Sequence, residues 1–360
     1  MKYRSLEWED VEEGQALPEI RYELSLLRLV AMVRASGHYD YVHFDRDYAR
    51  SAGARDAFIA THHVAGLFSR LATDWSGPQA DLRSLTWSMS SQSCAGDMLT
   101  ITGRVGRKYT NDRGEFLVDL VDLTIGHETA PQAASASATL VLPSRTGGPV
   151  GISGIPAPRP KAEPDPLMPD FAKSMLGKVR EGLREPARPL TEDEIHLWCE
   201  CVEDWDPLYW DREYAAGSRH GGIIAPPAAI FFGAGSSARV GVGYLKPGED
   251  VPEPVREGLA GVALLQEFRK NLIAAGMPFM PPGLPEVAVV RSRADYFTPL
   301  RPGDSTRTQQ ELLNCSPMKR TRLGEGLFVT WVNSAFNQRE ELVRAVTLTA
   351  FHYRAAQPPA

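Results

Sequence analysis

Two runs of alternating apolar and polar residues, one in each half of the chain, dominate the hydrophobic pattern. Alternation of β-branched or aromatic residues with polar ones is typical of strands with one buried face. The predicted strands are 84–92, 98–110, 115–127 and 134–142 in the first run and 287–297, 303–316, 326–338 and 342–354 in the second. An apolar helix is predicted before each run, near 58–74 and near 224–235. Such a unit predicts an antiparallel sheet wrapped around one helix.

The two halves also repeat a polar loop that precedes the predicted helix. Residues 35–49, ASGHYDYVHFDRDYA, align without gaps on residues 201–215, CVEDWDPLYWDREYA. We call these stretches the first loop and the second loop. Their shared positions are Asp40/Asp206, Asp45/Asp211, Arg46/Arg212, Tyr48/Tyr214 and Ala49/Ala215. A duplicated unit explains this agreement most simply, with the two sheets expected to join edge to edge.

A stretch rich in proline and glycine, residues 143–169, separates the halves. It can neither propagate a helix nor join a central strand, so it predicts a semi-extended linker. We therefore expect a first unit at 1–142 and a second unit at 170–360. The second unit carries an insert at 236–286 that the first unit lacks. Long inserts of this kind often form lids or pocket walls.

Composition and charge restrict the class of protein. Apolar residues are 43% and charged residues 23% of the 360, which is globular composition. A net charge of -6 gives no global field that would attract nucleic acid or an anionic membrane surface. No apolar run has the length of a transmembrane helix. Four scattered Cys and the lack of an apolar leader predict a cytoplasmic protein with reduced thiols.

The second loop carries the clearest motif. Its run DWDPLYWD at 204–211, followed by Tyr214-Ala215, resembles the pattern D-x-N-P-x-H-x-D-x-x-Y/F-A of the MaoC-like (R)-specific enoyl-CoA hydratases. The first loop, with TDWSGP at 73–78, resembles the small catalytic subunit of actinobacterial steroid side-chain hydratases. The second loop, with LGEGLFV at 323–329, resembles their larger subunit. The resemblance implies an α+β fold, a tandem (double) hotdog in which two subunits are fused.

The same resemblance implies that the motif Asp and His form an acid–base pair. Neither loop has both groups. The first loop has His43 but carries His38 in place of the Asp, and the second has Asp204 but carries Tyr209 in place of the His. The family spacing assigns the backbone N–H that holds the thioester oxygen to Thr61 in the first half. In the second half it assigns this role to Pro227, which has no N–H.

We therefore expect the active site in the first half. His43 is the predicted acid–base group, and either Asp40 orients it or His38 acts beside it. The start of the following helix, at Thr61 and His62, is expected to hold the thioester oxygen. Four charged positions shared by the loops are instead expected to hold the loops in shape: Asp45, Asp211, Arg46 and Arg212.

The leading function is hydration or dehydration at the β carbon of a bulky enoyl thioester, carried by CoA or by acyl carrier protein. No cofactor and no metal-ligand cluster is predicted, and a homodimer is compatible with the sequence. Two alternatives stay open. One is another enzyme on the same scaffold, an isomerase, cyclase or thioesterase, and the other is a non-catalytic protein that binds an acyl ligand.

Overall fold

The computed structural model describes residues 3–38, 40–151, 164–184, 189–231, 281, 283–284 and 286–355. The insert predicted at 236–286 lies almost entirely outside these residues, as do linker residues 152–163. Within the described ranges, no helix is both long enough and apolar enough to cross a membrane.

The strands form one antiparallel sheet. In the first half they are β1 (Ile20–Leu24), β2 (Asp81–Met89), β3 (Asp97–Thr110), β4 (Phe116–His127) and β5 (Ala130–Val141). In the second half they are β6 (Val179–Arg184), β7 (Glu286–Tyr296), β8 (Thr306–Cys315), β9 (Lys319–Thr321), β10 (Gly324–Asn337) and β11 (Leu342–Ala355). The eight predicted strands are confirmed to within a few residues. The three short strands β1, β6 and β9 were not predicted.

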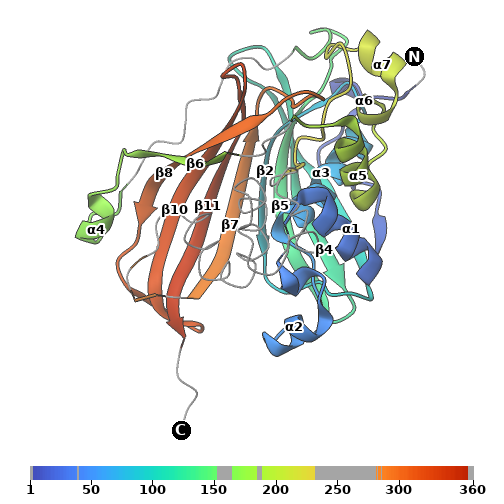
Figure 1. Cartoon of the computed structure of the whole chain (residues 1–360). Helices are drawn as coiled ribbons and strands as arrows, with labels where there is room; N and C mark the ends of the chain where they lie inside the picture. The colour runs from blue at the N-terminus through green and yellow to red at the C-terminus, as the bar shows by residue number, and fades with distance from the viewer. Residues whose placement is uncertain are drawn as a thin grey trace, which may run out of the picture.

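The strand order shows the duplication directly. The order is β1-β3-β4-β5-β2-β7-β11-β10-β8-β6, and β9 pairs with β10 off this path. Read outward from the β2–β7 junction, both halves have the same connectivity (Figure 1). Across the junction, Leu85 pairs with Ala294 and Trp87 with Ser292. The prediction that the two sheets join edge to edge is confirmed, and the pairing removes an exposed edge from each half.

Most of the helices lie beside the first half of the sheet, whereas α4 (Asp170–Lys173) lies apart, near β6 and β8 (Figure 1). The first half contains the 3-10 helices η1 (Trp8–Asp10) and η2 (Tyr41–His43) and the α-helices α1 (Leu26–Ser36), α2 (Arg46–Ser51) and α3 (Thr61–Ser76). The second half contains α4, α5 (Glu192–Val202), α6 (Pro207–Trp210) and α7 (Arg212–Gly217). The strands of the first half curve around α3 (Figure 1). The predicted central helix at 58–74 is therefore confirmed.

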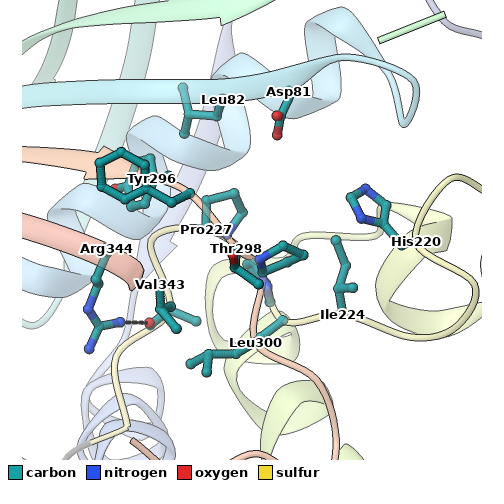
Figure 2. Close-up of a pocket in the computed structure, with 15 residues that line it drawn as sticks. Asp81, Leu82, His220, Ile224, Pro227, Tyr296, Thr298, Leu300, Val343 and Arg344 are labelled. Carbon is teal, nitrogen blue, oxygen red and sulfur yellow. Dashed lines mark hydrogen bonds between the residues drawn. The ribbon is translucent and has the colours of Figure 1, made fainter. Parts of the chain in front are cut away.

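The helix predicted near 224–235 is wrong over residues 224–231, which form a turn and otherwise irregular backbone. Figure 2 shows Ile224 and Pro227 on this non-helical segment. Pro226 and Pro227 explain the difference, because neither has an N–H and a proline disfavours helical geometry at the residue before it. Residues 232–235 lie outside the described part of the chain.

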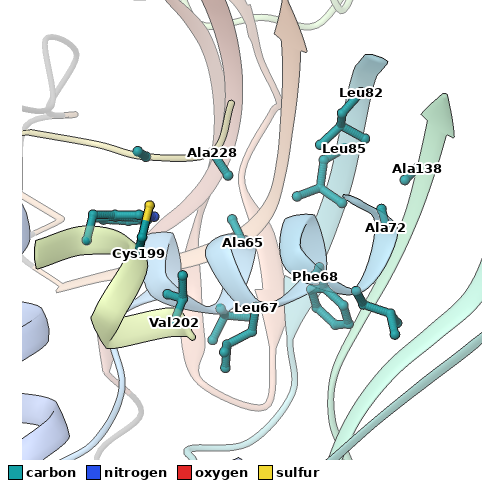
Figure 3. Packing of buried hydrophobic residues seen from close by; sticks show 14 of the residues in the cluster. Ala65, Leu67, Phe68, Ala72, Leu82, Leu85, Ala138, Cys199, Val202 and Ala228 are labelled. Carbon is teal, nitrogen blue, oxygen red and sulfur yellow. The ribbon is translucent and has the colours of Figure 1, made fainter. Parts of the chain in front are cut away.

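One apolar core cluster contains buried residues of both halves. The central helix α3 packs through Leu67 and Phe68 on one side, and α5 approaches it on the other (Figure 3). The approach is close: a Cβ added at Gly66 would lie 3.1 Å from side-chain carbons of both Trp198 and Val202. Glycine at this position thus allows a helix of the second half to pack directly on the central helix of the first.

Candidate active site

The end of α1 positions the beginning of the first loop. Gly37 follows the helix with φ 71°, and its N–H donates to the carbonyl of Val33 at 2.9 Å. This left-handed conformation favours glycine because it has no Cβ. His38 comes directly after the turn, and its N–H donates to the Ser36 hydroxyl at 3.3 Å. The half-buried His38 is thus held by the rigid end of a helix.

A short 3-10 turn then presents His43. The Asp40 carboxylate caps this turn by accepting from the N–H of Val42 at 3.3 Å. His43 is 8% exposed, and its Nδ1 lies 2.8 Å from the carbonyl oxygen of Phe58. A carbonyl oxygen only accepts, so Nδ1 carries the hydrogen and neutral His43 keeps a lone pair on Nε2. His43 is therefore oriented as a base.

Three histidines meet at the start of α3. The ring centroid of His38 lies 5.4 Å from that of His43 and 5.2 Å from that of His62. Thr61 is the first residue of α3, and its N-cap, Ala60, supplies no side-chain hydrogen bond to the helix start. The first N–H groups of a helix have no partner within it and carry a partial positive charge. The fold thus brings together all five predicted site residues, although their roles stay predictions.

Burial keeps these histidines neutral. Desolvation is the main cause that lowers the pKa of His43, and the bond to Phe58 and the charge of Asp40 only partly oppose it. Desolvation, followed by the charge of His43, lowers the pKa of His38 to about 4. The pKa of buried His62 is also well below its usual value, mainly through desolvation. At neutral pH the cluster therefore holds imidazoles with available lone pairs.

The second loop has the same backbone capping as the first loop but different side-chain chemistry. Asp206 caps α6 as Asp40 caps η2, accepting from the N–H of Leu208 at 2.9 Å. Asp204 and Tyr209 are only 1% and 2% exposed. Burial raises the pKa of Asp206 to about 7 and that of Asp204 well above its usual value. This loop therefore holds two buried carboxyls that keep their protons to a higher pH than an exposed Asp does.

The charged positions that both loops share do hold the backbone, as predicted. Asp45 caps α2 by accepting from the N–H of Tyr48 at 2.9 Å, and Asp211 caps α7 in the same way. Arg46 pairs with Asp56 at 2.6 Å. Arg212 pairs with Glu192 at 2.9 Å. These four side chains shape the loops.

A cavity lined mainly by second-half residues, with Asp81 and Leu82 of the first half, lies near the position equivalent to Thr61. Pro227, Tyr296 and Leu300 line it, together with the buried Arg344, whose guanidinium donates to the carbonyl of Ala229 at 2.6 Å (Figure 2). Since Pro227 has no N–H, this cavity lacks the donor expected at a thioester carbonyl. The active site in the first half stays a prediction.

Sequence reasoning missed the partner of His43. That partner is the backbone carbonyl of Phe58, which lies 15 residues further along the chain. A backbone carbonyl leaves no signal in residue identity. The contact of His63 with Trp198 of α5, whose ring centroids lie 5.0 Å apart, was also not predicted.

The fold defines the class of protein. A Mycobacterium tuberculosis protein described as a double hotdog superposes with a TM-score of 0.57 over 96% of this chain and 98% of its own, at 15% identity. The chain is therefore a double hotdog, an α+β protein whose two antiparallel sheets join edge to edge.

Sequence comparison gives the family. A family model described as FAS1-like, dehydratase domain region, matches residues 181–251. A 3-oxo-4,17-pregnadiene-20-carboxyl-CoA hydratase beta subunit from M. tuberculosis is 33% identical over 92 residues, covering 26% of this chain and 71% of that protein. A probable enoyl-CoA hydratase alpha subunit from Thermomonospora curvata is 29% identical over 177 residues, which is 48% of this chain. The chain spans about half, 49%, of that alpha subunit. It belongs to the MaoC-like enoyl-CoA hydratase family and is similar to both kinds of subunit.

Proposed function

We propose that this protein adds water to the β carbon of an α,β-unsaturated acyl-CoA, or removes it in the reverse direction, with His43 as the acid–base group. The observation that carries the proposal is the 2.8 Å contact between His43 Nδ1 and the Phe58 carbonyl, which leaves the Nε2 lone pair for the reaction. Membership of the hydratase family supports the reaction class.

The proposed reaction begins with a water molecule beside His43. Nε2 takes one proton from the water while the remaining hydroxide adds to the β carbon. The electrons of the C=C bond move onto the thioester oxygen. When the carbonyl re-forms, the α carbon takes a proton from the His43 imidazolium, either directly or through the neighbouring His38. The lowered pKa of His43 suits both steps, because the neutral base is present at pH 7 and its imidazolium is a strong acid.

The start of α3 is the proposed oxyanion site. The negative charge that develops on the thioester oxygen would be stabilised by the N–H groups of Thr61 and His62 and by the positive end of the α3 dipole. Ala60 leaves this helix start without a side-chain cap. A substrate oxygen can therefore take the place that a capping side chain fills elsewhere.

The relatives' names support CoA as the carrier and a bulky acyl group, since one of them is a pregnadiene-carboxyl-CoA hydratase subunit. The proposal therefore includes CoA as the carrier, a bulky acyl group, a cytoplasmic location and a homodimer. It also includes the unit boundaries at 1–142, 143–169 and 170–360.

The test measures turnover of a bulky enoyl-CoA in two ways. One is the loss of the absorbance of the conjugated thioester, and the other is the incorporation of labelled oxygen from water at the β carbon. We expect His43→Ala to lower kcat by about a hundred- to ten-thousand-fold, since a positioned acid–base group is lost. The matched control is Tyr209→Phe, because Tyr209 occupies the equivalent position of the second loop. It should retain turnover within a few-fold.

Near-normal turnover by His43→Ala, with the fold intact, would remove the catalytic assignment. Conversion of the enoyl-CoA without incorporation of label would favour the isomerase alternative over hydration. Thioester binding without any turnover would favour the acyl-binding alternative.

A further inference from the structure

The first loop groups three side chains that commonly bind metal ions. One ligand atom each from His38, Asp40 and His43 lies within 4.8 Å of the other two. Two imidazoles and one carboxylate form a ligand set that suits Zn²⁺ and related divalent ions. The spacing H-x-D-x-x-H alone does not indicate such a site. The meeting of the three groups depends on the turn at Gly37 and on the 3-10 helix.

The surroundings of two of these groups match those of metal ligands. The Nδ1–H of His43 donates to the Phe58 carbonyl, so Nε2 presents a lone pair in a fixed direction. Ligating histidines usually bond their second nitrogen to a backbone carbonyl or carboxylate in this way. The Oδ1 atom of Asp40 is held by the N–H of Val42 at 3.3 Å, which leaves the other oxygen for a metal.

We propose that His38, Asp40 and His43 form a binding site for one divalent transition-metal ion of the Zn²⁺ type, which binds the Nε2 lone pair of His43. Metal–ligand distances of about 2.0–2.2 Å place tetrahedral ligands roughly 3.4 Å apart. Three protein ligands leave the fourth position to water, as in open zinc sites.

The surroundings also limit the affinity. The partial positive charge at the start of α3 opposes a cation, and Asp40 supplies the one negative charge of the ligand set. We therefore expect binding weaker than that of a closed structural zinc site.

Two other contacts between a histidine and a carboxylate occur among the described residues, and both lack a second histidine. His127 lies 3.8 Å from Asp97, and His196 lies 3.8 Å from Glu192. One imidazole and one carboxylate bind divalent ions more weakly than three ligands do. His196 is therefore a suitable control for adventitious binding.

A consequence follows for the reaction. Nε2 of His43 has one lone pair, so it cannot bind a metal ion and accept a proton from water at the same time. The ion should therefore inhibit hydration and be removable by a chelator. This consequence rests on the proposed function, whereas the binding site itself does not.

Binding is tested without any substrate. The full chain, stripped with a chelator, is titrated with Co²⁺, whose visible absorption reports its ligands, and Zn²⁺ is then added as a competitor. We expect the wild-type chain to bind one equivalent of Co²⁺, which Zn²⁺ displaces. The affinity for Co²⁺ should be at least tenfold lower in Asp40→Asn and in His38→Phe. The His196→Asn control should bind as the wild type does. Melting temperatures establish that the variants are folded.

No saturable equivalent, or binding unchanged in both Asp40→Asn and His38→Phe, would overturn the site. With active protein, one equivalent of Zn²⁺ should suppress turnover and a chelator should restore it. If turnover stays unchanged or rises when Zn²⁺ fills the site, the ion does not compete with the reaction for Nε2 of His43. Co²⁺ binding by a chain that never hydrates an enoyl-CoA would leave the site standing and contradict only the proposed function.

Discussion

Asp40 and Asp206 hold equivalent positions in the two loops, and each caps the turn that follows it. The two carboxyls differ in their chemistry because their surroundings differ. Asp40 is half-buried beside two histidines, whereas Asp206 is 8% exposed and burial raises its pKa to about 7. The same residue type therefore lies half-buried between histidines in one half and is a buried carboxyl with a raised pKa in the other.

The raised pKa of Asp206 has a consequence for stability. Because the folded state holds this proton more tightly than the unfolded state, where the pKa is about 3.9, the group's contribution is full below that value and is lost as the pH rises through about 7. Asp206→Asn removes the titration and keeps an acceptor for the Leu208 N–H. We expect the free energy of unfolding of the variant, relative to wild type, to rise by roughly 2–4 kcal/mol between pH 4 and pH 8.

Urea unfolding at a series of pH values measures this difference. At pH 4 the carboxyl is largely protonated in the folded state, so that end of the series serves as the internal reference. A difference that stays constant from pH 4 to pH 8 would show that Asp206 is ionised in the folded protein.

At the scale of elements, the contact between α3 and α5 depends on a missing side chain. A Cβ at Gly66 would already lie 3.1 Å from carbons of Trp198 and Val202, both of which are buried. We expect Gly66→Leu to overpack this contact and to lower the free energy of unfolding by about 1–3 kcal/mol. Gly66→Ala should stay close to wild type, because its gain in helix propensity, about 1 kcal/mol, offsets the tight contact.

Denaturant unfolding of both variants tests the packing. Equal stability of Gly66→Leu and wild type would mean that the two helices can separate at little cost. The shared core would then be weaker than its close packing indicates.

At the scale of the whole molecule, the two halves complete each other's core. Helix α5 of the second half packs on α3, with Trp198 and Val202 close to Gly66. Figure 3 shows Cys199 and Val202 on this helix. Strands β2 and β7 join the sheets. A first half alone would expose both the α3 surface and the β2 edge, which favours aggregation.

We therefore predict that a chain cut after residue 156, inside the proline-rich segment, assembles only when both pieces are co-expressed. A tag on residues 1–156 should then retain residues 157–360 on purification, and the complex should show near-ultraviolet circular dichroism like that of the intact protein. Residues 1–156 expressed alone should be insoluble or should bind a hydrophobic dye. Cooperative unfolding of that piece alone would contradict the prediction.

The sequence by itself determined the strands, their duplication and the equivalence of the two loops. These features are local or repeated: alternation with a period of two fixes which face of a strand is buried, and gapless similarity pairs Asp40 with Asp206. It also indicated His43, Asp40, His38, Thr61 and His62 as a site, through their place in a family pattern. The sequence pattern was misleading at residues 224–231, because their apolar character predicted a helix that two prolines disfavour.

Only the tertiary structure decided how those residues meet. His38 follows α1, His43 ends a 3-10 turn and His62 begins α3, and their rings come within 5.2–5.4 Å because the chain folds back between them. The bond from His43 to the Phe58 carbonyl was equally unpredictable, because every residue has a carbonyl and its direction depends on the backbone path. The close approach of α5 to Gly66 depends on long-range packing that no local pattern encodes.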